Sequence, residues 1–261
     1  MRFLKWLWRE AWPPVVFLAG LICIWSLSIK AFDIPKLLLP TPSDVFEVAS
    51  DADLDLWAST LLTAEWSLLG LGASLLIGTA VAMVFASSGV IRRGAYPYAI
   101  FLQTVPIIAI APLVIIWCGR GPLGITIVSV VLSVFPIITN ATAGMLSVDR
   151  NLEELFQLHN ARWWQSLLKL RLPSSVPYIL VGLRIGAGAS VIGAIVGEFF
   201  IGAGARPPFG LGYQLQAANT SGRTDTLFAV VLASTLLGVT VFAATSLLSR
   251  LVLAVWYDES G

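Results

Sequence analysis

The chain has 261 residues and a formal net charge of +1 at pH 7; 57% of its residues are hydrophobic and 12% are charged. Soluble domains carry about twice that charged fraction, so the composition predicts an all-α membrane protein. The sequence has no basic run or aromatic–basic platform, so nucleic acid is not an expected partner.

Six apolar stretches are long enough to cross a bilayer as helices. They lie at roughly 12–32, 62–86, 94–118, 122–146, 176–200 and 226–250. The first mimics a signal peptide, but it lacks a convincing small-residue cleavage site, so we expect it to be a transmembrane helix. Cys23 and Cys118 lie in apolar runs and are expected to be small buried hydrophobic residues rather than a disulfide or a metal pair.

The basic residues predict that both termini are cytoplasmic. With the N-terminus inside, ten lysines and arginines fall in inner segments: Arg2, Lys5, Arg9, Arg92, Arg93, Arg150, Arg162, Lys169, Arg171 and Arg250. Five fall in outer segments: Lys30, Lys36, Arg120, Arg206 and Arg223. Cytoplasmic loops are enriched in positive charge, so this orientation is favoured.

The first outer loop is acidic and prone to turns. Its acids are Asp33, Asp44, Glu47, Asp51, Asp53 and Asp55. Pro40 and Pro42 bias the residues before them away from helix, and a short surface helix can start near Ser43 as its N-cap. We expect residues 1–60 to form an N-terminal unit of one helix and this loop, and residues 61–255 to form a core domain of five spans.

Small residues recur at helical spacing on two spans. The second span has Gly70, Ser74, Gly78, Ala82 and Ala86. The fifth has Gly182, Gly186 and Ser190 on one stripe, with Ala189, Gly193 and Gly197 beside it. Lipid gives helices no hydrophobic reason to associate, so these stripes predict close helix packing, within one subunit or across a dimer. The alternative is chance in a sequence rich in glycine and alanine.

The third span contains Pro97, Pro106 and Pro112, which remove backbone donors and kink a helix. Inside a membrane the freed carbonyls need protein or water partners. We therefore expect the segment with Gln103, Thr104 and Pro106 to be a bent helix that faces the transport pathway. A kink that only improves packing is the alternative.

Arg184 and Glu198 are the clear charges inside predicted spans, and such charges are candidates for function. At 14 residues apart they face nearly the same way but lie about 20 Å from each other, so they cannot pair within one helix. For each, a structural anchor and a role in the pathway or its gating stay open.

The polar segment between the fourth and fifth spans indicates two short amphipathic helices. Asn151 begins a pattern resembling a capping box, with Glu153 and Glu154 in the first turn. The shared face is formed by Leu155, Phe156 and His159. Asn160 can adopt the left-handed conformation that ends a helix.

The second helix is expected to run from Ala161 to a stop at Pro173. Its apolar residues are Trp163, Trp164, Leu167 and Leu168. Exposed residues of this kind mark either a docking surface for a partner or a helix that lies flat at the membrane surface. Both interpretations stay open on the residues alone.

This segment, NLEELFQLHNARWWQSLLKLRLPSSVPYILVGLRIG, resembles the signature loop of binding-protein-dependent ABC importer permeases. That loop runs roughly Glu-Ala-Ala, a glycine, then Leu-Pro. The chain also resembles the sulfonate/nitrate/taurine branch from about residue 35 to 255. The matching segments are Leu39 to Ser43, Val105 to Pro112, Glu198-Phe199 and Gly210-Leu211-Gly212-Tyr213. It departs from the pattern at Glu154-Leu155-Phe156, where alanines are usual, and at His159, where glycine is usual.

The resemblance implies a multi-pass permease of the bacterial inner membrane, with a coupling-helix loop between helices 4 and 5. It also implies a second copy of this chain, a separate ATPase that uses ATP and Mg²⁺ in the cytoplasm, and a substrate-binding protein outside. The loop residues implied to dock on the ATPase are Glu153, Glu154, Leu155, Phe156, Leu158, His159, Asn160, Ala161, Leu172 and Pro173. The chain has no phosphate-binding loop and no metal-ligand spacing, so we expect neither cofactor nor metal on it.

The branch imports small polar solutes, which makes a sulfonate, taurine, nitrate or bicarbonate-like anion the first expectation. A pyrimidine vitamin precursor is the alternative. An autonomous secondary transporter would need coupling charges near the middle of the bilayer, where neither intramembrane charge clearly lies. An enzyme is not expected, because one histidine and no metal cluster provide no catalytic set.

Overall fold

The computed structural model describes residues 2–51, 54–202 and 209–258, and it describes no side chains for residues 2–11, 14 and 255–258. Asp53 and Arg206, and the side chains of Arg2, Lys5 and Arg9, lie outside this part. The described residues contain helices and no strand, which confirms the all-α membrane fold. Five helices are long and apolar enough to span a membrane: α1 (Arg2–Phe32), α3 (Leu56–Ser87), α6 (Pro122–Leu146), α10 (Val176–Ile201) and α12 (Thr224–Asp258).

The third predicted span bends at the expected segment, but it is interrupted there and forms two helices rather than one bent helix. Two helices, α4 (Gly89–Leu102) and α5 (Ile107–Cys118), meet at an angle of 99°. Pro106 precedes α5 with an extended backbone and has no N–H to continue a helical ladder. Pro97 and Pro112 remain inside their helices.

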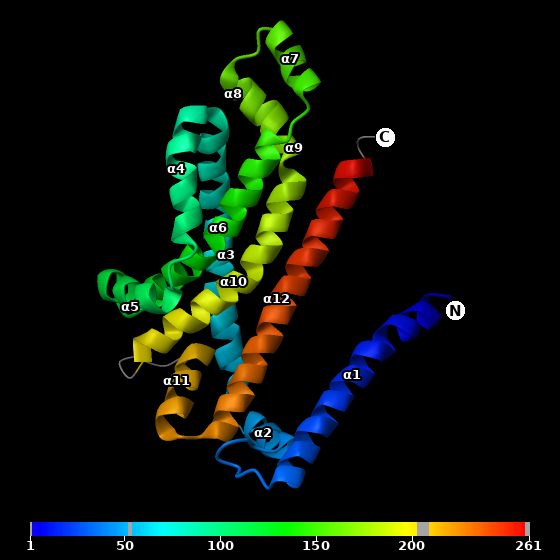
Figure 1. The fold of residues 1–261 in the computed structure, drawn as a ribbon, viewed down its shortest axis with the longest axis vertical. Coiled ribbons are helices and arrows are strands. Elements are labelled where there is room, and N and C mark those ends of the chain that lie inside the picture. Colours follow the sequence, from blue (N-terminus) through cyan, green and yellow to red (C-terminus); the bar gives the residue numbers. More distant parts are fainter. Residues whose placement is uncertain (1, 52–53, 203–208, 259–261) are drawn as a thin grey trace.

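The remaining elements are short and lie near the two ends of the bundle. They are α2 (Pro42–Ala49), α7 (Arg150–Leu158), α8 (Trp163–Ser166), the π-helix η1 (Leu167–Arg171), α9 (Leu172–Ser174) and α11 (Leu211–Ser221). In Figure 1, α7 and α8 lie at one end, with α2 and α11 at the other. The surface helix expected near Ser43 is present as α2, but Thr41 is its N-cap and forms a capping box with Asp44. The sequence did not predict α11.

The core is built around close contact between α10 and α6, in which glycines bring the backbones together. A Cβ on Gly193 would lie 2.6 Å from Ser129 Cα, and a Cβ on Gly197 would lie 3.0 Å from Ile125 Cα. Ser129 Oγ donates a hydrogen bond of 2.9 Å to the Ser190 carbonyl. Such approach is possible only where one helix has no side chain, which is how membrane helices gain packing contacts.

Helix α3 packs on α6 in the same way. A Cβ on Gly78 would lie 2.8 Å from a side-chain carbon of Ile137, and one on Gly70 would collide with Ser129. The hydroxyls of Ser74 and Ser133 hydrogen-bond at 2.7 Å. Both small-residue stripes therefore make their contacts within one chain.

Helix α1 stands away from the bundle for most of its length (Figure 1). Near its end, the rings of Trp25 and Phe228 lie 5.7 Å apart, and Ile29 is buried. Cys23 is exposed on this helix, so its expected burial is wrong, because little of the chain packs against α1.

We predict that Gly193→Ala destabilises the protein by about 1–3 kcal/mol, because the new methyl group meets the backbone of α6. Gly188→Ala is the matched control, since a Cβ there has no atom within 4 Å. Thermal unfolding in detergent should show a lower Tm for Gly193→Ala only. Equal Tm values for the two variants would contradict the close α6–α10 contact.

Candidate functional site

Helix α7 is closed at both ends by local hydrogen bonds. Asp149, rather than Asn151, is its N-cap, and its carboxylate accepts from the Asn151 N–H at 2.8 Å. At the other end Asn160 has φ 51°, the left-handed conformation expected of it. The Asn160 N–H donates to the Gln157 carbonyl and the Ala161 N–H to the Phe156 carbonyl, which together form a Schellman cap.

His159 has a structural role at this cap. Its ring Nδ1 lies 2.9 Å from the carbonyl oxygen of Leu155, and a carbonyl can only accept, so the ring N–H donates. The same carbonyl accepts the His159 backbone N–H at 3.2 Å, so the ring adds a second hydrogen bond at the end of α7. A glycine, which is usual at position 159, could adopt the left-handed conformation. In this chain the next residue, Asn160, adopts it instead.

The two faces of α7 differ. Leu152, Leu155 and Leu158 are 45%, 47% and 79% exposed on the outer face. Phe156 and Gln157 instead line a cavity of about 290 Å³ between α7 and the end of α3. The expectation that Phe156 shares the face of Leu155 is therefore wrong, because helical spacing alone does not show which side the bundle occupies.

The helical segment does not end at Pro173 as predicted, because Pro173 lies inside α9. The Leu172 N–H donates to the Leu167 carbonyl five residues back, which opens the wide turn of η1, and the chain continues through α9 into α10. Leu172 packs on a buried cluster with Leu167, Ala82 and Met145. Leu172 thus belongs to the joint between the loop and the bundle. Glu154 is half exposed and pairs with Arg150 at 3.0 Å.

At the opposite end of α10, Glu198 is buried and anchors α11. Its carboxylate accepts a hydrogen bond from Thr63 Oγ1 at 2.9 Å and another from the Gly212 N–H at 2.9 Å. The Leu211 N–H donates to the same Thr63 oxygen at 2.9 Å. A Cβ on Gly210 or Gly212 would collide with Glu198. The Glu198-Phe199 motif and the Gly210-Leu211-Gly212-Tyr213 motif therefore pack against each other. The carboxylate also faces the positive end of the α11 dipole.

Arg184 has no such partner. Its Nε is buried and makes no hydrogen bond to any described residue. Arg184 precedes Gly188 by four residues and Ile192 by eight, so all three lie along one side of α10. Gly188 and Ile192 line an apolar groove of about 460 Å³ between α10 and α12.

The other pathway candidates, Gln103, Thr104 and Pro106, are exposed at the break between α4 and α5. Thr104 Oγ1 donates to the Phe101 carbonyl at 2.7 Å, which closes the last turn of α4. No described hydrogen bond joins these residues to Arg184 or Glu198. Gln103, Thr104 and Pro106 lie between α4 and α5, whereas Arg184 and Glu198 lie on α10.

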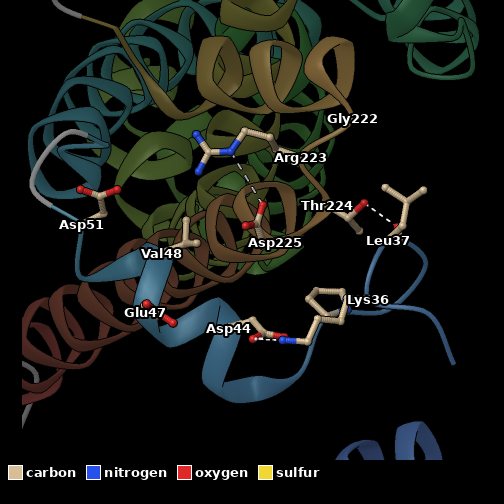
Figure 2. A pocket seen from close by; sticks show the side chains of 11 residues that line it. Lys36, Leu37, Asp44, Glu47, Val48, Asp51, Gly222, Arg223, Thr224 and Asp225 are labelled. Carbon is tan, nitrogen blue, oxygen red and sulfur yellow. Dashed lines mark hydrogen bonds and ion pairs between the residues drawn. The ribbon is translucent and has the colours of Figure 1, made fainter. Parts of the chain in front are cut away.

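A charged cavity of about 720 Å³ lies where α2 meets the start of α12 (Figure 2). Lys36 Nζ lies 2.8 Å from the Asp44 carboxylate, and Thr224 Oγ1 donates to the Leu37 carbonyl at 2.6 Å. The hydrogen bond from Lys36 lowers the pKa of Asp44 to about 2, so the α2 capping box keeps its charged acceptor at any pH above that value. The cavity was not predicted from the sequence, because it is formed by residues up to 187 positions apart, such as Leu37 and Thr224.

Comparison with known proteins identifies a family. The sequence model of the family described as "binding-protein-dependent transport system inner membrane component" matches residues 74–254. The chain is 33% identical to the formylaminopyrimidine transport permease protein ThiX of Halalkalibacterium halodurans, over 94% of this chain and 96% of ThiX. It is 31% identical to the taurine transport system permease protein TauC of Escherichia coli, over 87% and 85%. It is 29% identical to the riboflavin transport system permease protein RibX of Chloroflexus aurantiacus, over 94% and 91%.

A solved structure shares the fold. The chain aligns with a crystal structure of a bacterial ABC transporter involved in the import of the acidic polysaccharide alginate, with a TM-score of 0.57 and 17% identity. The alignment covers 96% of this chain and 99% of that one. At this identity the likeness concerns the fold alone.

We predict that Thr63→Val destabilises the protein by about 1–3 kcal/mol, because Glu198 and the Leu211 N–H both lose a partner in a buried place. Thr60→Val is the matched control: its hydroxyl donates only to the Leu56 carbonyl of its own helix. Proteolysis of the detergent-purified protein should cut faster near α11 in Thr63→Val than in Thr60→Val. Equal cleavage rates would show that the Glu198 network does not hold α11.

Proposed function

The chain belongs to the family of inner-membrane components of binding-protein-dependent transport systems, and we propose from this that it forms the solute pathway of an ATP-driven importer. Members of this family are multi-pass permease subunits of ABC importers and are not themselves enzymes. Two copies of the chain would enclose the pathway. ATP would be hydrolysed with Mg²⁺ by a separate cytoplasmic ATPase, and a binding protein would deliver solute from outside.

The observation that carries this proposal is the outer face of α7. It is a short, firmly capped helix at one end of the bundle (Figure 1), and it exposes Leu155 and Leu158. Exposed leucines on a rigid helix fit a hydrophobic groove on a partner protein. We therefore assign the ATPase contact to this face, with Glu154 and His159 at its edges.

The proposed orientation of the bundle rests on the positive charges near the α7 end. Arg150 begins α7, Arg162 follows it, and Arg92 and Arg93 lie near the start of α4. Positive charge marks the cytoplasmic side of a membrane protein. We thus place the α7 end in the cytoplasm and the α2 and α11 end outside.

We propose that the solute is a small polar anion of the sulfonate, taurine, nitrate or bicarbonate type. The buried Nε of Arg184 has no hydrogen-bond partner among the described residues, whereas the carboxylate of Glu198 is matched by Thr63 and the N-terminus of α11. The uncompensated intramembrane charge is therefore positive, and it can attract an anion. The α10–α12 groove that continues from Arg184 would face the pathway.

A formylated aminopyrimidine is the second candidate solute. The observation in its favour is the 33% identity to a permease named for formylaminopyrimidine transport. An uncharged pyrimidine would use Arg184 only as a hydrogen-bond donor. An autonomous secondary transporter is disfavoured, because the buried acid that such a protein could protonate, Glu198, is engaged in holding α11.

We predict that the double variant Leu155→Asp/Leu158→Asp loses the ATPase during purification from membranes, because carboxylates cannot enter an apolar groove without a large desolvation cost. The double variant Leu155→Met/Leu158→Met keeps the surface apolar and should retain the ATPase. Both variants should insert into the membrane normally. Retention of the ATPase by the aspartate variant would exclude this face as the docking surface.

We predict that Arg184→Gln lowers uptake of radiolabelled taurine or nitrate at least tenfold in vesicles with the complete importer, the loss of about 1.4 kcal/mol of anion stabilisation. Arg184→Lys should retain part of the uptake, since it keeps the charge. Uptake of formylaminopyrimidine by the wild-type importer, with no uptake of either anion, would overturn the anion proposal in favour of the pyrimidine.

A further inference from the structure

One guanidinium joins the docking helix to the transmembrane bundle. Arg171, the last residue of η1, places Nη2 2.8 Å from Glu153 Oε1 on α7. Its Nη1 donates to the Ala86 carbonyl in the last turn of α3 at 2.6 Å. Arg171 thus contacts two elements that are distant in sequence, one on each side of the cavity beneath α7.

The chemistry of both contacts is favourable. The last four carbonyls of α3 have no partner within the helix, and a cation there also meets the negative end of the helix dipole. The side chains of Arg171 and Glu153 are 26% and 30% exposed, so water screens their attraction only in part. The planar fork of arginine can serve two acceptors in fixed directions, which a lysine ammonium does less well.

Apart from the contact through Arg171, α7 is loosely packed against the bundle. The cavity of about 290 Å³ separates Phe156 and Gln157 of α7 from Ala86 and Leu167 of the bundle. No residue of α7 is fully buried. A force on α7 therefore has few apolar contacts to act through on this side, and the polar contact through Arg171 spans the gap.

Arg171 ends a π-helix that leads into the bundle. The five residues of η1 form a π-helix, a wide turn that often marks a functional position in a helix. It lies directly before α9 and α10, which pack on α6. A displacement at Arg171 thus reaches both α3 and the start of the α6–α10 pair.

We propose that Arg171 is a positioning residue that transmits the movement of α7 to the bundle, by holding Glu153 and the α3 carboxyl end on one guanidinium. This inference rests on the proposed function, since it takes α7 to be the element on which the ATPase acts. Arg171 lies behind α7. Glu153, which the resemblance implied to dock on the ATPase, pairs with Arg171 and lines the cavity, so we place neither residue on the outer docking face.

The test uses the complete importer, with ATPase and binding protein, in proteoliposomes. The readout is the ratio of ATP hydrolysis stimulated by the solute-loaded binding protein to basal hydrolysis, because a purely structural role would change stability and assembly but not this ratio. Arg171→Gln should retain the ATPase and lower the ratio about fivefold or more. Glu153→Gln should act in the same way, and the double variant should be no worse than either single variant.

Lys169→Gln is the matched control, since it removes the same charge from an exposed side chain of the same π-helix. It should leave the ratio unchanged, and Arg171→Lys should restore part of it. A ratio for Arg171→Gln equal to that of Lys169→Gln would overturn the proposal. Loss of the ATPase from Arg171→Gln would also overturn it, because Arg171 would then only build the docking surface. Failure of the wild-type chain to bind any ATPase would instead refute the proposed function.

Discussion

The direct contact between the backbones of α6 and α10 is the constraint on which the rest of the structure depends. Lipid chains are as apolar as leucine, so these helices associate only if their surfaces fit closely. Gly193 and Gly197 allow that fit, and Ser129 adds a hydrogen bond across it to the Ser190 carbonyl. Helix α3 uses Gly70 and Gly78 to pack on the same α6. The three helices thereby form a rigid unit to which the other elements attach.

Each end of this unit carries a polar contact that fixes a short helix. At one end Glu198 and Thr63 hold the start of α11. At the other end Arg171 holds α7 against the end of α3. Because α10 contains Glu198 and follows directly from η1 and α9, one continuous stretch of chain links both contacts. In the proposed orientation, this arrangement suits a protein in which a movement of α7 in the cytoplasm must change the outer end.

Much of this fold follows from the sequence, because spanning length and hydropathy are strong signals. Five of the six predicted spans agree with helices of the structure, and the expected left-handed Asn160 is present. The sequence placed the bend at the segment with Pro106, but it did not show that the helix would be interrupted there, since Pro97 and Pro112 stay inside helices. Helix α11 was missed because contacts to residues up to 148 positions away determine its place. The inward direction of Phe156 was missed because periodicity defines faces without saying which one the bundle covers.

Photo-cross-linking can show directly whether the proposed ATPase contacts the outer face of α7. A photoreactive amino acid at position 158, the most exposed of the three leucines on α7, is irradiated in membranes that contain the complete importer. We expect a covalent adduct between this chain and the ATPase. We also expect a much weaker adduct from position 156, whose side chain lines the cavity and is only partly exposed. Adducts with lipid alone at position 158, or an equal ATPase adduct from both positions, would exclude the outer face of α7 as the ATPase contact.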